Sequence, residues 1–307
     1  MSADSIRFAF DLSPETGLGH FHRCLCLAKD LESKKYKTEL YAIGEGNHEF
    51  LVREQRLHGR KISRIGDLPR TGPLIIVDSY LVKNSFVFAA QVSHYARRAY
   101  VADSSDFPKW ADRIVYPHLG DPNRTVSDWG GVVLEGREQF IFDPALCLEQ
   151  PTKHTDSCVV ILSGTETKFY EMEIFLSKFS EKQNVKINFC NPSTPRAALL
   201  ELIRRSELAI VSAGIALIET IAASCKPLPI KYAENQMPTL EMIRKTNPGF
   251  KYLARQEIFS AESQETVQHF FNALVNQDVS SQQLGLGHQG ASKSADFFIS
   301  EEHPTSA

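Results

Sequence analysis

Hydrophobic runs and amphipathic stretches alternate along the chain, first in the N-terminal half and again in the C-terminal half. In the first half, runs typical of buried strands cover residues 6–11, 38–43, 74–78, 98–102 and 113–116, and helical periodicity covers 20–32 and 86–95. In the second half, strands are predicted at 157–162, 185–190, 208–212 and 227–231, and helices at 168–179, 195–205 and 217–224. Buried strands that alternate with helices are typical of parallel sheets covered by helices. The pattern therefore predicts an α/β protein with two such sheets.

The segment between the two halves, residues 142–156, contains two prolines and lacks periodicity, so we interpret it as a linker. We expect a Rossmann-like N-terminal domain over residues 1–145 and a Rossmann-like C-terminal domain over 146–284, facing each other across a cleft. Residues 285–300 are expected to form a helix that crosses back to the first domain. A disordered tail is expected over 301–307.

The length, composition and net charge of the chain restrict the class of partner. A chain of 307 residues with 42% hydrophobic residues is long enough for two cores, and a net charge of −3 gives no broad basic surface, so we expect no nucleic-acid partner. The sequence shows no apolar run of membrane-spanning length and no signal-peptide pattern, so we expect no membrane span and a cytoplasmic location. Six cysteines without a CxxC pair favour buried thiols over zinc sites or disulfides. The oligomeric state stays open.

A glycine-rich loop, GLGH at residues 17–20, separates the first predicted strand from the first helix. Gly17 and Gly19 allow the backbone to turn tightly beside a ligand, and the N–H groups at the helix start favour an anion such as phosphate. His22 replaces the third glycine of a dinucleotide-binding motif, which disfavours NAD. His20 is the candidate acid or base, and the alternative is a structural or surface histidine.

Polar residues follow two of the predicted strands in the first half. Ligands in open α/β sheets collect beyond the carboxyl ends of strands, so Asp78 and Tyr80 are candidates for contact with a substrate. The alternative for Asp78 is a cap for the next helix. Residues 102–106, which include Asp103, repeat the arrangement after the following strand. Two carboxylates without further ligands do not suggest a magnesium site, so no metal is expected.

Two loops of small residues follow strands in the second half and leave room for a nucleotide. They contain Ser163, Gly164 and Thr165 in the first loop and Ser212, Ala213 and Gly214 in the second. Glu219 lies in the helix after the second loop, where a carboxylate can accept both hydroxyls of a ribose; the alternative is a solvent-facing glutamate. Asn235 and Gln236 follow the next strand, and their amides suit sugar hydroxyl or N-acetyl groups.

Together these segments resemble the UDP-sugar hydrolases of pseudaminic acid biosynthesis, whose substrate is a UDP-linked diacetamido-trideoxy sugar, and the spore-coat polysaccharide proteins grouped with them. The resemblance rests on GLGHFHR at 17–23, DSY at 78–80, SAG at 212–214 followed by Glu219, and NQ at 235–236. The matches occur in order, from about residue 6 to 298. Two segments depart from the family pattern: SGTE at 163–166 stands for a double-glycine loop, and Ile215-Ala216 for a glycine followed by serine or threonine.

The resemblance implies a GT-B-like fold in which the C-terminal domain holds most of the UDP, without a metal or cofactor. It implies that His20 activates a water molecule, which attacks the anomeric carbon and releases UDP and the free sugar. The substrate site would contain Gly17, Gly19, Arg23, Asp78, Tyr80, Asn235 and Gln236. The nucleotide site would contain Ser163, Gly164, Thr165, Ser212, Ala213, Gly214 and Glu219.

Two alternatives to hydrolysis remain at this point. In a GT-B-type glycosyltransferase, His20 would deprotonate an acceptor hydroxyl in place of water. In a nucleotide-sugar-binding protein, the same loops would bind the substrate without catalysis. Hydrolysis is the main prediction because the sequence shows no obvious apolar patch for membrane association.

Overall fold

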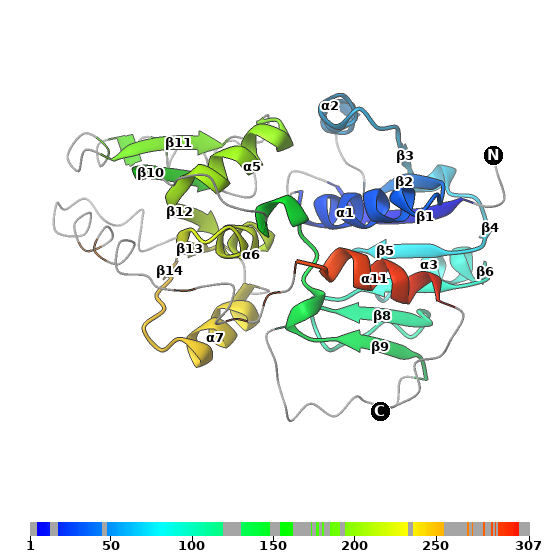
Figure 1. Ribbon diagram of the computed structural model, residues 1–307. Coiled ribbons are helices and arrows are strands. Elements are labelled where there is room, and N and C mark those ends of the chain that lie inside the picture. The colour runs from blue at the N-terminus through cyan, green and yellow to red at the C-terminus, as the bar shows by residue number, and fades with distance from the viewer. Residues whose placement is uncertain are drawn as a thin grey trace. The chain divides into compact units, whose positions relative to one another are not determined.

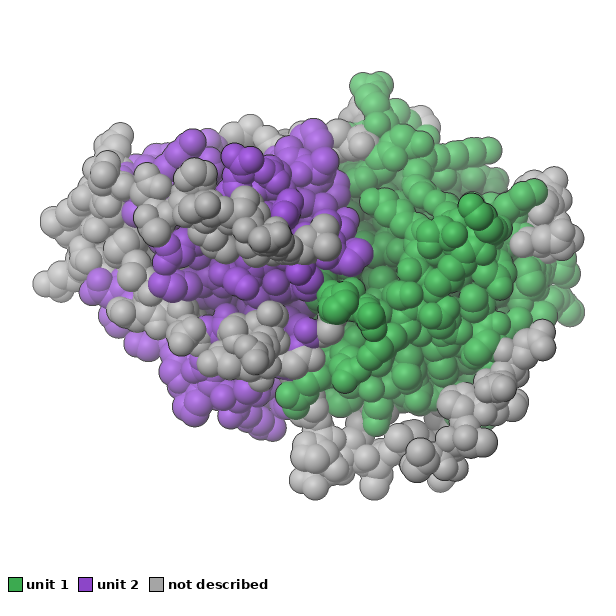
Figure 2. Space-filling model, viewed as in Figure 1, with its two compact units in different colours: residues 1–142, 287–307 green, residues 143–286 purple. Residues whose placement is uncertain are grey.

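The computed structural model describes residues 5–12, 18–44, 48–118, 130–147, 154–161, 185–190, 194–232, 236–254 and 288–300, and the single positions 173, 176, 177, 180, 269, 272, 279, 284 and 286. The chain divides into two compact units (Figure 2). Unit 1 consists of Met1–Phe142 and Gly287–Ala307, and unit 2 of Asp143–Leu286. Each unit is built on a parallel β-sheet.

The sheet of unit 1 has seven parallel strands in the order β3-β2-β1-β5-β7-β8-β9. They are β1 (Ile6–Asp11), β2 (Thr38–Ile43), β3 (Ile62–Arg64), β5 (Ile75–Asp78), β7 (Arg98–Val101), β8 (Arg113–Tyr116) and β9 (Val132–Glu135). Two short strands, β4 (Thr71–Gly72) and β6 (His94–Tyr95), pair separately. The strand order reverses between β1 and β5, which is where open α/β sheets bind ligands.

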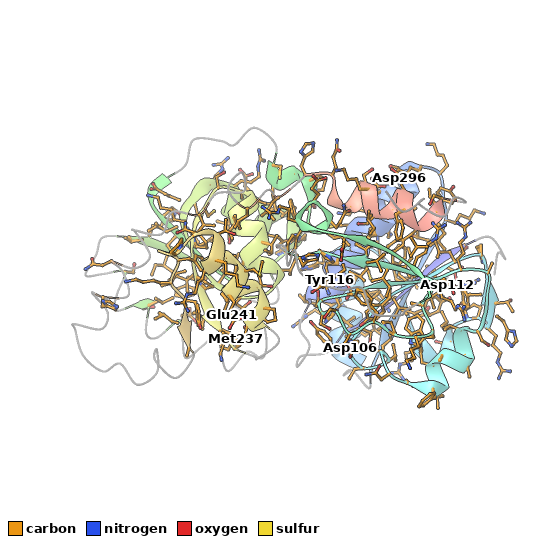
Figure 3. All side chains as sticks on the ribbon, turned by 90° about the horizontal axis from the view of Figure 1, so that it is seen from below. Asp106, Asp112, Tyr116, Met237, Glu241 and Asp296 are labelled. Atoms are coloured by element: carbon orange, nitrogen blue, oxygen red, sulfur yellow. The ribbon has the colours of Figure 1, made fainter. Side chains whose placement is uncertain are left out.

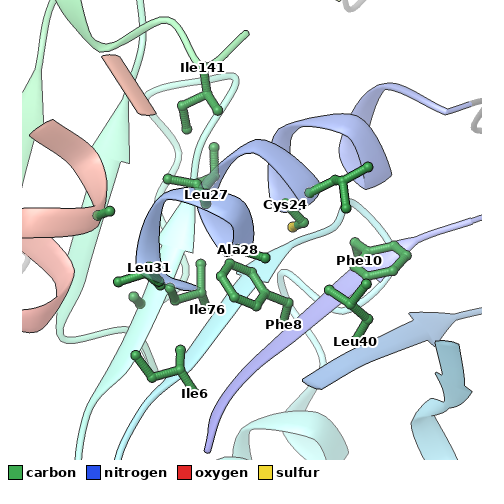
Figure 4. Packing of buried hydrophobic residues seen from close by; sticks show 14 of the residues in the cluster. Ile6, Phe8, Phe10, Cys24, Leu27, Ala28, Leu31, Leu40, Ile76 and Ile141 are labelled. Atoms are coloured by element: carbon green, nitrogen blue, oxygen red, sulfur yellow. The ribbon is translucent and has the colours of Figure 1, made fainter. Parts of the chain in front are cut away.

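Helices cover both faces of this sheet. Helices α1 (Gly19–Ser33) and α11 (Gly290–Ile299) lie together on one face, and α3 (Phe86–Val92) packs on the other (Figure 1). Apolar residues recur in α1 at helical spacing, so that one stripe of the helix faces the sheet. From this stripe Cys24, Leu27 and Leu31 are fully buried against Phe8 and Ile76 (Figure 4). The other helical segments among the described residues of unit 1 are α2 (His48–His58) and the short 3-10 helices η1 (Ile65–Asp67) and η2 (Arg137–Gln139).

The last described helix, α11, is a structural part of unit 1 although it lies at the other end of the chain. Lys34, just after α1, donates a 2.6 Å hydrogen bond to Asp296 on α11. Figure 3 labels Asp296. Phe298 is fully buried in the same core as the α1 stripe. At the helix start, a side chain on Gly290 would place its Cβ 2.1 Å from the Phe140 carbonyl oxygen, so this close approach requires glycine.

The sheet of unit 2 has five parallel strands in the order β11-β10-β12-β13-β14. They are β10 (His154–Ile161), β11 (Lys186–Cys190), β12 (Ser206–Ser212), β13 (Lys226–Lys231) and β14 (Leu253–Ala254). Its described helices are α5 (Arg196–Arg205), α6 (Ile215–Ala222) and α7 (Met237–Thr246), preceded by the 3-10 helix η3 (Pro144–Cys147). Figure 3 labels Met237 and Glu241 on α7. Here the strand order reverses between β10 and β12, and α6 starts at the end of β12.

The strands predicted in the first half agree with β1, β2, β5, β7 and β8 to within one residue at each end. In the second half, β10 begins at His154, three residues before the predicted start at residue 157. The prediction missed α2, α7, β3, β9 and β14. The predicted helix 86–95 was too long, since α3 ends at Val92 and His94 and Tyr95 form β6. The helix predicted at 168–179 lies mostly outside the described residues.

Candidate active site

Three aspartates lie at the carboxyl ends of neighbouring strands in unit 1. Asp11 ends β1, Asp78 ends β5, and Asp103 follows β7. Because β1, β5 and β7 are adjacent, all three reach the edge where the strand order reverses. Asp11 and Asp78 are buried, and the Asp103 side chain is 25% exposed. Carboxylates gathered in this way need positive partners, since buried unpaired charges are strongly unfavourable.

His20, in the first turn of α1, pairs with Asp78. Its Nδ1 lies 2.5 Å from Asp78 Oδ1, and the residue is 5% exposed. Burial alone would lower the pKa of His20, but the charge of Asp78 and the hydrogen bond to it outweigh burial and raise the pKa. A carboxylate only accepts hydrogen bonds, so Nδ1 carries the proton and Nε2 is the basic nitrogen. None of the described residues forms a hydrogen bond with Nε2, which leaves it able to take a proton from a substrate.

Arg23 supplies the positive charge that holds two of the aspartates. Its Nε and Nη2 each donate to Asp78 at 2.7 Å, and Nη1 and Nη2 donate to Asp103. Burial alone would lower the pKa of Arg23, but Asp103 and Asp78 raise it well above its usual value. Residues three positions apart share one face of a helix, which is why His20 and Arg23 reach the same carboxylate.

Asp103 stays ionised over a wide pH range. Burial alone would raise the pKa of its carboxyl group, but the charge of Arg23 and its hydrogen bonds lower it to about 2. The Tyr80 hydroxyl also donates to Asp103 Oδ2, at 2.5 Å. With Arg23 on one side and Tyr80 on the other, Asp103 links the charged network to a side chain that is 43% exposed.

The loop after β5 is fixed by Asp11. Its carboxylate accepts a hydrogen bond from the Ser79 hydroxyl and another, of 2.7 Å, from the Tyr80 backbone N–H. The Tyr80 ring stands edge-on to His20 with 4.6 Å between ring centroids. Burial, the largest influence on Asp11, raises the pKa of its carboxyl group. Asp11 thus positions the tyrosine that packs on the candidate base.

Unit 1 thus brings together His20, Arg23, Asp78 and Tyr80, all of which the sequence had singled out. The alternative of Asp78 as a helix cap is wrong, because Ser85 caps α3 by accepting from the Phe88 N–H. Gly19 is the first residue of α1, and no side chain caps the helix at Leu18. Gly17 lies outside the described residues.

Asp11 and Asp103 were not among the predicted site residues. Each carried a signal, because both follow buried strands in the same way as Asp78. His22 lies on another side of α1, where its ring is 5.7 Å from that of His58.

In unit 2, the segment from Ser212 to Gly214 leads from β12 into α6. Ser212 and Ala213 are buried, and Gly214 directly precedes the first residue of α6, Ile215. No side chain caps this helix, so its first N–H groups have no such partner among the described side chains. The departure at Ile215-Ala216 therefore falls in the first turn of the helix.

Glu219 does not face solvent, so that alternative is wrong. The residue is 2% exposed, and both carboxylate oxygens accept from the Arg196 guanidinium. The Gln236 side chain accepts a 2.8 Å hydrogen bond from the N–H of Tyr232, which directly follows β13. Ser163, Gly164, Thr165 and Asn235 lie outside the described residues.

Within the described ranges, no three His, Cys, Asp or Glu side chains are grouped as metal ligands. Arg23 lies between the carboxylates of Asp78 and Asp103 and pairs with both. None of the described helices has the length and apolar character of a membrane span.

The structure resembles several solved proteins at low sequence identity. MurG of Acinetobacter baumannii matches over 96% of this chain and 99% of its own, with a TM-score of 0.56 and 13% identity. MnaA of S. aureus, solved with UDP, matches over 95% of each chain, with a TM-score of 0.51 and 8% identity. The spinosyn rhamnosyltransferase SpnG matches over 97% of each chain, with a TM-score of 0.50 and 10% identity.

No protein-family model matches the sequence, and no curated protein sequence matches it either. The structural likenesses establish the fold, which is the two-domain Rossmann-like GT-B fold, and so confirm the predicted fold class.

Proposed function

We propose that the protein transfers a sugar from a UDP-sugar to an acceptor hydroxyl, with His20 as the general base. The observation that carries the proposal is the His20–Asp78 pair at the point where the strand order of unit 1 reverses. A histidine whose Nδ1–H is held by a carboxylate presents Nε2 as a base, in the manner of catalytic histidine–aspartate pairs.

In the proposed step, His20 Nε2 removes the proton from the acceptor hydroxyl while that oxygen bonds to the anomeric carbon. The bond between the anomeric carbon and the diphosphate oxygen breaks, and its electron pair leaves with UDP. The histidine becomes an imidazolium ion, which Asp78 stabilises. Arg23 keeps Asp78 in place, and Tyr80 lies against the imidazole ring.

The nucleotide is assigned to unit 2, with Ser212, Ala213, Gly214 and Glu219 as the binding residues. A helix start with free N–H groups favours a diphosphate, and α6 begins without a side-chain cap beside these residues. UDP in the structure of S. aureus MnaA supports the choice of nucleotide. The rhamnosyltransferase named among the similar structures supports transfer as the reaction.

Hydrolysis is the second candidate, and the motif GLGHFHR favours it. Water would then take the place of the acceptor, with UDP and a free diacetamido-trideoxy sugar as products. Against hydrolysis, Leu81, Phe86 and Val87 are exposed apolar side chains on the segment after β5, at 56%, 92% and 81%, and an apolar acceptor could contact them.

The test is UDP release from UDP-N-acetylglucosamine, UDP-glucose and the UDP-linked diacetamido-trideoxy sugar, each with and without a mixture of sugar and lipid-like alcohols. Release only with an alcohol supports transfer, and release in water alone supports hydrolysis. His20→Ala should abolish turnover while UDP binding stays within about threefold, since the base is needed only for the chemical step. If UDP binds to neither the wild-type protein nor the His20→Ala variant, the proposed function is wrong.

A further inference from the structure

Arg196 and Glu219 form a buried ion pair in unit 2 that joins two helices. Arg196 is the first residue of α5, and Glu219 lies in the second turn of α6. Figure 1 labels both helices. Arg196 Nη1 donates to Glu219 Oε2 at 3.1 Å, and Nη2 donates to Oε1 at a shorter distance. The side chains are only 10% and 3% exposed. Two parallel hydrogen bonds fix both the position and the plane of the carboxylate.

The placement of this pair follows from the fold. Helical side chains lean toward the helix N-terminus, so Arg196 leans toward the start of α5. α5 follows β11, and α6 follows β12, with β10 between these strands in the sheet. Both helices therefore start at the carboxyl edge of the sheet, where the strand order reverses.

A glutamate at a diphosphate site has two requirements. Its negative charge must be balanced, because an unbalanced carboxylate repels the anionic ligand and is unfavourable when buried. It must also keep accepting capacity for the ligand. An ionised carboxylate has about four lone-pair sites, of which Arg196 uses two, so about two remain for the two hydroxyls of a ribose.

We propose that Arg196 is a positioning residue of the nucleotide site, which holds Glu219 so that the carboxylate selects a ribose over a 2′-deoxyribose. The inference rests on the proposed binding of a uridine nucleotide by unit 2. Because the pair is bidentate and buried, Arg196 remains on Glu219 when the nucleotide binds and does not move to the diphosphate.

The test measures dissociation constants of UDP, 2′-deoxy-UDP and UMP by calorimetry. The wild-type protein is expected to bind UDP about 10-fold to 100-fold more tightly than 2′-deoxy-UDP, the preference that one hydrogen bond to a charged group gives. Arg196→Ala should bring this ratio close to one, as should Glu219→Gln. Arg196→Lys should keep an intermediate ratio, since lysine replaces the charge but not the two-pronged contact. The UDP-to-UMP ratio should not change in any of them.

The matched control is Arg205→Ala, because Arg205 ends the same helix, is 54% exposed and pairs with Glu201. It should keep both wild-type ratios. Thermal unfolding shows whether each variant is folded, and if Arg196→Ala is not, Arg196→Lys and Glu219→Gln decide.

Three results would overturn the inference and leave the proposed function standing. The first is a ribose preference unchanged in the folded Arg196 variants, which makes the pair a structural tie between helices. The second is loss of the UDP-to-UMP preference alone, which places Arg196 on the diphosphate. The third is wild-type UDP binding without any ribose preference. A wild-type protein that binds no UDP contradicts the proposed function itself.

Discussion

The charge of the candidate base is set by Asp78 at the end of β5, Asp103 after β7 and Arg23 in α1. Asp78 raises the pKa of His20, Arg23 holds Asp78, and Asp103 shares the arginine. Two carboxylates, one arginine and one histidine form a network with few unsatisfied groups, which allows it to remain buried. Removal of one member should therefore alter the titration of the base as well as its position.

Asp78→Asn is expected to lower kcat by about 10²-fold to 10⁴-fold, the usual contribution of an oriented base. The base form of His20 is populated only as the pH rises through its raised pKa. Without Asp78, burial lowers that pKa, so the acidic limb of the kcat/KM profile should move to lower pH. Asp67→Asn, at an exposed position in the same unit, should leave the profile unchanged.

Asp78→Asn should also change how the free energy of unfolding depends on pH. The raised pKa of His20 stabilises the folded protein fully below the unfolded value of about 6.5, and this stabilisation is lost as the pH rises through the folded pKa. Asp78→Asn should thus lower the free energy of unfolding more at pH 6 than at pH 9 in urea titrations. An equal loss at both pH values would mean that Asp78 does not raise the pKa of His20.

At this scale the sequence predicted His20, Asp78 and Tyr80 from their places after strands, but not the contacts between them. Nothing in the spacing of Asp11 and Asp103 shows that both lie beside Asp78, because strand order is set by the fold and not by sequence distance. Glu219 was singled out without its partner, because Arg196 reaches it from a different helix.

The elements that hold the site differ in how strongly their sequence specifies them. Central strands such as β1 and β5 are buried along their whole length, because both faces of a parallel sheet are covered by helices. The missed strands β3 and β9 are short edge strands with incomplete burial. Helix α2 is rich in charged residues and contains only four apolar residues, too few to single it out in the sequence.

Helix α11 packs against α1, and Gly290 allows α11 to approach the chain closely at Phe140. Gly290→Ala would bring Cβ to 2.1 Å from the Phe140 carbonyl oxygen, so the backbone must shift. We expect a loss of about 1–3 kcal/mol in the free energy of unfolding, as for other overpacked sites. Gly130→Ala in the same unit is the control, since no atom lies within 4 Å of its added Cβ. Urea unfolding of both variants measures the difference, and equal stabilities would contradict the packing of α11 on this segment.

For the whole molecule, the fold restricts the chemistry without fixing it. The structural relatives at TM-scores of 0.50 and above share only 8–13% of their residues with this chain, so the reaction has to be argued from the site. In the proposed function, His20 and its carboxylates belong to unit 1, and the nucleotide-binding residues belong to unit 2. Such a division can be tested by asking which unit a nucleotide stabilises.

Both tryptophans, Trp110 and Trp129, belong to unit 1, so tryptophan fluorescence follows the unfolding of that unit. Far-UV circular dichroism follows the helices of both units. A ligand stabilises the state that binds it, by about 2.7 kcal/mol at 100 times its dissociation constant. UDP should therefore raise the free energy of unfolding of unit 2, followed by circular dichroism in urea, by about this amount. The fluorescence transition, which follows unit 1, should shift less. Glu219→Gln should reduce this increase and His20→Ala should not. A shift confined to fluorescence would place the nucleotide in unit 1 and contradict the assignment of Ser212 to Glu219.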